Sequence, residues 1–428
     1  MLGRQLPSII TERVPGPASE RGVERLARTE CPSLTMRRAR RAERSGAAHD
    51  PIVWVEARGA NVVDADGNVF VDLIGAFGVC AVGHAHPRVT DAVARQAARL
   101  PHALGDVHPS SAKLDLLDRL AAWLPFDARI VLGLNGADAI AAALKTAVLA
   151  TGRPGVVAFE GGYHGLMYGP LAICGSHPGF REPFAAQLNP HVRFLPYGDA
   201  AALEAIDGTV GAVVVEPALG RGGLVFPPEG WLAQVEARAR AAGAVVIVDE
   251  ILTGFGRTGR RFAFEGQLTP DLVCVGKALG GGLPISACAG TAEVMAAWGD
   301  PDREAIHTAT FAGYPIGCAA ACAALDAIED EGLVERARAV GEKWRERLAR
   351  ALGSRAREVR GRGLMIGVEL DDGAKASRVV QAALTHGWLL LGAGPGGRTL
   401  QLTPPLTIDE ALLDAFSQVL PRLLDEAA

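Results

Sequence analysis

The sequence predicts an α/β fold, with a mostly parallel central sheet in a large domain and a smaller α+β domain after it. Four apolar runs rich in β-branched residues recur at 155–162, 211–217, 244–250 and 271–277. They are nearly continuous rather than alternating, as strands buried on both faces of a parallel sheet are. Helical patterns such as 231–243, which ends at a glycine, separate the runs. This order of strands and helices is typical of a sheet covered by helices.

The segments around the sheet are predicted from local patterns. Residues 1–47 are rich in arginine, and we expect a flexible arm there. Residues 62–73 alternate in polarity on both sides of an Asp-Gly turn, which predicts a hairpin. We assign 48–100 to an N-terminal segment that packs with the small domain, 101–319 to the large domain and 320–428 to the small domain.

Composition narrows the classes of function. The 428 residues are 49% hydrophobic and carry a net charge of -5, which argues against a general nucleic-acid or membrane-surface binder. Seven cysteines are scattered without a CxxC pair, so neither a disulfide framework nor a metal site is indicated. The N-terminus lacks the apolar core of a signal peptide and no apolar run reaches membrane-spanning length, so we expect a cytoplasmic protein.

Lys277 stands out because the sequence has only five lysines among its 43 lysines and arginines. It follows an apolar run and precedes three glycines in "GKALGGG". An arginine keeps its proton in proteins, whereas burial lowers the pKa of a lysine and makes a neutral, nucleophilic amine accessible. A lysine whose charged end merely reaches water at a strand end is the alternative.

Three of the apolar runs end on charged groups, at Glu216, Asp249 and Lys277. Ligands of open α/β sheets bind beyond the carboxyl ends of the strands, so these side chains are candidates for one site. Pyridoxal phosphate forms an imine with a lysine and needs an anion beside its ring nitrogen. Lys277 and Asp249 suit these two roles.

Two further segments suit the same cofactor. Asn135 and Gly136 precede a predicted helix, whose free backbone N–H groups can bind a phosphate. Tyr163 and His164 lie in a glycine-lined loop after a strand, where the tyrosine can stack on a flat ring. A capped helix without a ligand explains the first segment equally well, and a loop tyrosine is more often a packing residue. The spacing around Lys277 does not match a P-loop.

The chain from about residue 50 to its end contains eight short motifs in order. They are "GHAHP", "NGADA", "GGYHG", "VEPALGRGG", "DEILTGFGRTG", "GKALGGGLP", "TATFAGYP" and "LTPPLTI". In this order they resemble the class III (omega-type) pyridoxal phosphate-dependent aminotransferases. The resemblance implies a fold type I homodimer with shared active sites. It also implies ping-pong transfer of an amino group from an amine or amino acid to a keto acid or aldehyde.

The resemblance assigns roles to single residues. Lys277 would bond to the cofactor and move protons, and Asp249 would hold the ring nitrogen. The other implied cofactor contacts are Gly136, Ala137, Tyr163, His164, Ile251 and, from the neighbouring subunit, Thr310.

Phe77, Arg221 and Gln401 are expected to face the substrate. Many members have a glutamate where this chain has Arg221 and a carboxylate-binding arginine where it has Gln401. One hypothesis is that both positions drifted to a surface role. The other is that Arg221 binds the carboxylate of a donor or acceptor and Gln401 adds a hydrogen bond.

Two other functions fit these motifs. An aminomutase or lyase can use the same scaffold, and the need for a second carbonyl substrate separates it from an aminotransferase. A cofactor-binding protein without turnover is disfavoured by the intact Lys277 and Asp249.

Overall fold

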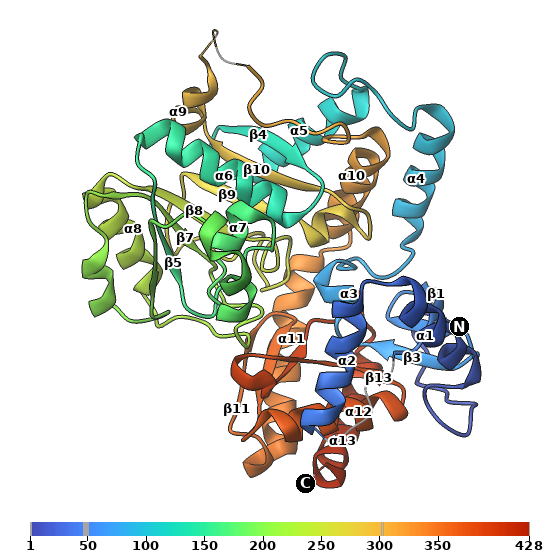
Figure 1. Ribbon diagram of the computed structural model, residues 1–428. Coiled ribbons are helices and arrows are strands. Elements are labelled where there is room, and N and C mark those ends of the chain that lie inside the picture. The colour runs from blue at the N-terminus through green and yellow to red at the C-terminus, as the bar shows by residue number, and fades with distance from the viewer. Residues whose placement is uncertain (1, 46–50, 301, 303, 428) are drawn as a thin grey trace.

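A seven-stranded sheet forms the middle of the large domain in this computed structural model, which describes residues 2–45, 51–300, 302 and 304–427 (Figure 1). In space the order is β4 (Ala128–Gly133), β10 (Ser286–Thr291), β9 (Leu272–Val275), β8 (Val245–Asp249), β7 (Val210–Val215), β5 (Gly155–Phe159) and β6 (Val192–Leu195). Strand β10 is antiparallel to β4 and β9, and the other neighbouring pairs are parallel. The predicted fold class, with a mostly parallel sheet, is confirmed.

The central strands are buried on both faces, as their continuous apolar runs predict. All residues of β7, β8 and β9 are buried. In β8, Val246 and Val248 belong to one apolar cluster, whereas Val245 and Ile247 belong to the cluster on the other face. Successive strand residues point to opposite faces, so an apolar residue is needed at every position.

Helices cover both faces of this sheet. Helix α6 (Gly136–Thr151) packs on β10, β9, β8 and β7, and α8 (Trp231–Ala242) packs on β7 and β8. Other helices of this part are α4 (Pro87–Arg99), α5 (Ser111–Trp123), α7 (Tyr168–Ala172), α9 (Ala292–Met295) and α10 (Pro315–Asp330). Within the described residues, no helix combines the length and the apolar character needed to cross a membrane.

The N-terminal part consists of two helices and a small sheet. The predicted hairpin is present as β2 (Asn61–Asp64) and β3 (Val69–Asp72), which pair antiparallel. Strand β3 also pairs with β13 (Trp388–Leu389) from the C-terminal part of the chain. The remaining elements are α1 (Pro17–Thr29), α2 (Pro32–Ser45), β1 (Trp54–Arg58) and the single turn α3 (Gly75–Gly78).

The C-terminal part has a second four-stranded sheet with helices on it. Its strands follow the order β11 (Glu358–Arg362), β12 (Met365–Glu369), β15 (Thr399–Leu402) and β14 (Leu391–Ala393). Its helices are α11 (Leu333–Leu352), α12 (Gly373–Thr385) and α13 (Glu410–Glu426). This part lies below the large sheet in Figure 1.

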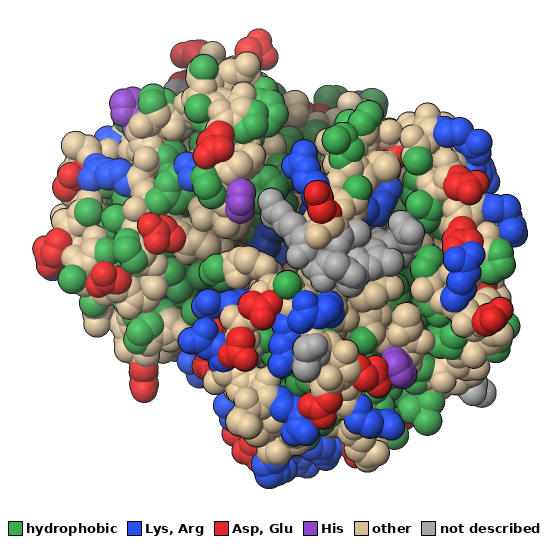
Figure 2. All heavy atoms as spheres, turned by 60° about the horizontal axis from the view of Figure 1, so that its bottom comes forward, with side chains coloured by type: hydrophobic (Ala, Val, Ile, Leu, Met, Phe, Trp, Pro, Cys, Tyr) green, Lys and Arg blue, Asp and Glu red, His purple; other side chains and the backbone are tan. Residues whose placement is uncertain are grey.

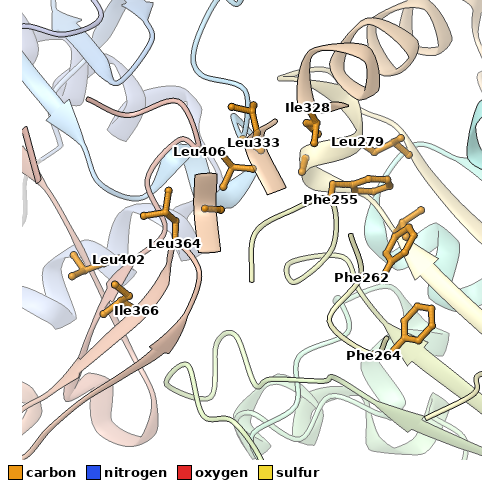
Figure 3. Close-up of a cluster of buried hydrophobic side chains, with 14 of the residues drawn as sticks. Phe255, Phe262, Phe264, Leu279, Ile328, Leu333, Leu364, Ile366, Leu402 and Leu406 are labelled. Carbon is orange, nitrogen blue, oxygen red and sulfur yellow. The ribbon is translucent and has the colours of Figure 1, made fainter. Parts of the chain in front are cut away.

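One apolar core runs from the large sheet into the C-terminal part (Figure 3). Phe255 and Phe262 belong to the same buried cluster as Leu364 and Leu406. The expected domain limit between residues 319 and 320 lies inside helix α10, which belongs to this core. The division of the chain into four segments therefore stays a prediction.

Charged side chains of both signs are scattered over the face drawn in Figure 2, and many Lys and Arg side chains gather in its lower half. Arginines supply the cation in exposed ion pairs such as Arg338–Glu335 and Arg355–Asp425. Exposed pairs of this kind contribute little to stability.

Candidate active site

Three charged side chains lie at the carboxyl ends of neighbouring strands. Glu216 follows β7, Asp249 ends β8, and Lys277 comes two residues after the end of β9. These strands are parallel neighbours in the sheet, so their carboxyl ends meet at one edge. The charges of Asp249 and Glu216 both act on Lys277. The structure therefore brings together the three residues that the sequence marks as strand ends.

Asp249 is buried and paired with a histidine. His164 Nδ1 lies 2.7 Å from Asp249 Oδ2, and the backbone N–H of Ile251 donates to Asp249 Oδ1 at 3.0 Å. Burial lowers the pKa of His164, but its hydrogen bond to Asp249 and the charges of Asp249 and Glu216 outweigh this effect and raise the pKa overall. Asp249 is thus a buried carboxylate that hydrogen bonds hold in one orientation.

Lys277 begins a short 3-10 turn, Lys277–Gly280, with a left-handed φ of 43°. A residue with a Cβ rarely adopts this conformation, and such strain clusters at functional sites. Burial lowers the pKa of the Lys277 amine; the charges of Asp249 and Glu216 oppose this shift, and those of Arg257 and Arg221 add to it. Within the part of the chain that the structure describes, the amine donates no hydrogen bond, so it is free to react.

The N-terminus of helix α6 presents two free backbone donors. The side chain of Asn135 accepts a hydrogen bond from the N–H of Asp138 at 3.1 Å. The N–H groups of Gly136 and Ala137 have no acceptor among the described residues, as is normal in a first helical turn. A Cβ added to Gly136 would lie 2.7 Å from Ile251 Cδ1, so Ile251 packs against this terminus. The site can hold an anion there.

Glu216 anchors the two loops that carry Tyr163 and Arg221. Its Oε1 accepts from the N–H of Tyr163 at 2.9 Å, and its Oε2 accepts from the N–H of Gly220 at 3.0 Å. Burial raises the pKa of Glu216 to about 7, against the opposing charge of His164. The loop of Tyr163 also touches α6, because a Cβ on Gly165 would lie 2.6 Å from the Cβ of Ala137.

Arg221 is exposed and is held by two aromatic rings. Its guanidinium carbon lies 4.9 Å from the centre of the Tyr163 ring and 5.4 Å from that of Phe180. Within the described residues, the guanidinium forms neither an ion pair nor a hydrogen bond. A cation that is fixed in direction and unpaired is ready to meet an anion.

Phe77 and Gln401 lie where the turn α3 meets the C-terminal sheet. Phe77 is 64% exposed on the turn α3. A Cβ on the next residue, Gly78, would lie 3.9 Å from Lys277 Cδ. Gln401 donates to Thr403 Oγ1 at 3.2 Å, and that hydroxyl donates to the carbonyl of Ile74, just before the turn.

Thr310 is exposed and shares no hydrogen bond with the other candidate residues that the structure describes. It lies in the segment before α10, which contacts the loop around residue 105: Thr308 donates to Asp106 Oδ2 at 3.2 Å. The His102 and Phe311 rings also lie 5.0 Å apart there.

Sequence reasoning missed two groups of residues at this site. Phe180, which flanks Arg221, lies in a short 3-10 segment with no motif that points to it. Asp72 and His84 form a buried pair near the turn α3, at 2.8 Å. His84 belongs to the quoted "GHAHP" motif, but nothing local shows its partner.

These groups fit pyridoxal phosphate. The free amine of Lys277 matches the aldehyde of the cofactor, and the buried carboxylate of Asp249 matches its ring nitrogen. The free N–H groups of Gly136 and Ala137 match its phosphate. A mostly parallel sheet that carries them along one edge defines a fold type I, pyridoxal phosphate-dependent enzyme.

Comparison with known proteins identifies the family. A sequence model of the class III aminotransferases matches residues 43–424, and the chain belongs to this family. It is 38% identical over 377 residues to the acetylornithine aminotransferase of Streptomyces coelicolor, covering 87% of this chain and 91% of that protein. The acetylornithine aminotransferase of Methanopyrus kandleri is 39% identical over 378 residues, with 88% and 94% covered.

Solved structures agree with this assignment. The ornithine aminotransferase of Toxoplasma gondii superposes with a TM-score of 0.86 at 29% identity, covering 96% of each chain. The PLP-bound amine transaminase of an uncultivated Pseudomonas species has a TM-score of 0.82 at 26% identity, covering 89% of this chain and 96% of that one. The predicted family, fold type, cofactor and aminotransferase activity are confirmed.

Proposed function

We propose that this aminotransferase uses Lys277 and Asp249 as its catalytic residues and works in two half-reactions, on an amino donor and then on a keto acid or aldehyde. The observation that carries this proposal is the free amine of Lys277, whose pKa burial lowers, beside the buried Asp249 carboxylate. A contribution to folding stability alone does not readily explain a buried amine and a buried carboxylate at neighbouring strand ends.

The residues around this pair would hold the cofactor. When bound, pyridoxal phosphate withdraws electrons from the substrate carbon and so stabilises negative charge there. The N–H groups of Gly136 and Ala137 would bind its phosphate. Asp249, oriented by His164, would keep a positive charge at the ring nitrogen, and Ile251 and Tyr163 would contact the ring.

Lys277 would bind the cofactor covalently at rest and move protons during turnover. An amine whose pKa lies below its ordinary value can take a proton from a substrate carbon and return it elsewhere. Its left-handed backbone fixes the direction in which the side chain leaves the sheet edge. The charges of Asp249 and Glu216 limit the lowering of the pKa of Lys277, so the amine can still hold a proton.

Borohydride reduction tests the assignment of Lys277. The native chain should retain the cofactor after reduction and denaturation, with the added mass on the peptide of Lys277. Lys277→Ala should retain none, whereas Lys343→Ala, which removes an exposed lysine of α11, should behave as the native chain does. A label on any other residue, or a label that survives in Lys277→Ala, contradicts the proposal.

We propose a homodimer as the working form. The segment of Thr310 and the loop that it contacts carry exposed apolar side chains: Leu104 is 63%, Val107 67% and Phe311 55% exposed. Exposed patches of this kind are typical of a surface that another subunit covers. A second copy seated there would bring Thr310 to the phosphate of its partner. The predicted cytoplasmic location also stays a proposal.

We propose that the substrates include a carboxylate and that Arg221 binds it. The relatives are named for acetylornithine and ornithine, which are amino acids. Arg221 has no anionic partner within the described residues, and the Tyr163 and Phe180 rings hold its guanidinium in place. The carboxylate of an amino-acid donor or of a keto-acid acceptor would complete this arrangement, and Gln401 would add a neutral hydrogen bond.

A further inference from the structure

The turn α3 is left-handed over four consecutive residues. The φ angles are 56° at Gly75, 49° at Ala76, 62° at Phe77 and 80° at Gly78. Glycine adopts this conformation readily, but alanine and phenylalanine do so at a cost, because the Cβ approaches the following carbonyl oxygen. Two non-glycine residues in a row therefore need something outside the turn to hold them.

This turn borders the candidate active site. A Cβ on Gly78 would lie 2.8 Å from Leu252 Cδ1 and 3.9 Å from Lys277 Cδ. A Cβ on Gly75 would lie 2.8 Å from the carbonyl of Thr403. The turn is thus packed between Lys277 and the C-terminal part of the chain, while Phe77 is 64% exposed. An exposed aromatic ring on a strained turn does not serve the core.

The carboxylate of Asp72 holds the turn by accepting hydrogen bonds from its backbone. Its Oδ1 accepts from the N–H groups of Ile74 at 2.8 Å and Gly75 at 3.0 Å, and its Oδ2 accepts from that of Ala76 at 2.9 Å. The fourth contact is His84 Nε2, 2.8 Å from Oδ2. Asp72 is 1% exposed, so these four groups replace its water completely.

His84 is itself fixed in place. Its backbone exchanges two hydrogen bonds with Gly59, at 2.8 and 2.9 Å, and its ring lies 5.9 Å from the Trp54 ring in a T-shaped arrangement. Burial lowers the pKa of His84. Its hydrogen bonds to Asp72 and Cys80, together with the charges of these two groups, outweigh this effect and raise the pKa to about 10. The imidazole is therefore positively charged near neutral pH and compensates the buried charge of Asp72.

We propose that Asp72 and His84 are positioning residues that hold the left-handed turn and so place the Phe77 ring beside Lys277, where it contacts the carbon chain of the substrate next to its amine. The proposal rests on the proposed function of Lys277. Neither Asp72 nor His84 touches the reacting atoms. Asp72 and His84 act on the substrate only through Phe77. The Phe77 ring contacts an apolar part of the substrate.

A purely structural role for the ion pair makes a different prediction. If the pair is only structural, breaking it should lower the free energy of unfolding. The effect on substrate binding should then not depend on the side chain at position 77. A positioning pair should change substrate binding only while the Phe77 ring is present, so the two substitutions should not be additive. A double-mutant cycle separates these cases.

The cycle consists of His84→Gln, Phe77→Ala and the double variant, each loaded with pyridoxal phosphate. Glutamine keeps a donor for Asp72 but removes the charge. We measure kcat and KM for an amine donor, and by calorimetry the Kd of pentanoate, which has the carbon chain and carboxylate but no amine. His84→Gln should raise both KM and Kd about tenfold with kcat within about threefold, since binding rather than chemistry is affected. In the Phe77→Ala background the same change should alter both by less than about twofold.

Equal effects of His84→Gln in both backgrounds, or an effect on kcat alone, overturn the proposal. Should His84→Gln fail to fold, Asp72→Asn replaces it, because the amide oxygen still accepts from Ile74 and Gly75. Phe77→Ala removes an exposed side chain and carries no such risk. Unchanged KM and Kd in Phe77→Ala overturn the proposal by themselves. Failure of the proposed function would show instead as a native chain without a borohydride-trapped cofactor.

Discussion

Replacing Arg221 by alanine should separate substrates that carry a carboxylate from those that do not. The guanidinium lies over the Tyr163 and Phe180 rings and forms no ion pair within the described residues. Its removal therefore breaks no ion pair of the protein itself, and the loss should appear in substrate binding. The effect on a simple alkylamine should be small.

The magnitude follows from the exposure of the guanidinium and from its fixed direction. A two-point contact between arginine and a carboxylate is stronger than a neutral hydrogen bond, but solvent weakens it because Arg221 is exposed. The two rings reduce the entropy that the side chain loses on binding. We expect a loss of about 2 to 3 kcal/mol, which is about 30- to 150-fold in kcat/KM. Arg221→Lys keeps the charge but loses the planar, two-point geometry of the guanidinium. It should therefore show only part of this loss in kcat/KM.

The assay follows each half-reaction separately, from the change in cofactor absorbance after mixing with an amino-acid donor, a keto-acid acceptor or an alkylamine. Arg261→Ala is the matched control, because it also removes a guanidinium that lies over a ring, 5.1 Å from Trp123. Arg261 pairs with Glu329 on α10. The control should keep all three rates.

One result would refute the role of Arg221. If kcat/KM in Arg221→Ala stays within about twofold of the native value for every accepted carboxylate substrate, the guanidinium does not bind the carboxylate. A similar loss for the alkylamine would point instead to damage of the cofactor site. Such damage is expected to lower cofactor retention as well, which the absorbance spectrum reports directly.

Three further predictions concern the cofactor site, a buried carboxyl and the subunit contact. Gly136→Ala places a Cβ 2.7 Å from Ile251 Cδ1 and should weaken cofactor binding by about 1 to 2 kcal/mol in titrations, whereas Gly208→Ala, with open space around it, should not. Burial raises the pKa of Glu250 from 4.5 to about 8, so the folded chain keeps a proton that the unfolded chain has released, and the free energy of unfolding should fall as pH rises from 4.5 through 8. Glu250→Gln should flatten that fall in urea titrations, and parallel curves for the two proteins would contradict the assignment. Thr310→Ala should lower cofactor retention, as dilution to monomer should; tight cofactor binding by a demonstrated monomer would exclude a shared site.

The sheet was predictable because buried parallel strands need apolar residues at every position. The run 244–250 therefore reveals β8 without any tertiary information. The same holds for the hairpin of β2 and β3, whose Asp-Gly turn is a local signal. Lys277 and Asp249 could be chosen from the sequence because each ends such a run and because lysine is rare in this chain.

The surroundings of these residues could not be predicted in the same way. His164 pairs with Asp249 across 85 residues of chain, and Arg221 lies over the Tyr163 and Phe180 rings, which come from two other segments. The left-handed turn at Phe77 carries no local mark of strain, since Ala76 and Phe77 are ordinary in any other backbone conformation. Only the packing around the turn shows what holds it.

The sequence by itself determined the α/β fold, the strand-end lysine and carboxylate, and the resemblance to class III aminotransferases, because each depends on residues that are close together in the chain. Only the tertiary structure decided that Arg221 forms no ion pair with the residues that the structure describes, that Glu216 anchors two loops, and that Asp72 and His84 hold the turn beside Lys277. Contacts between distant segments form when the core closes, and the directions of side chains at a sheet edge are then set by hydrogen bonds and ring contacts that no local pattern encodes.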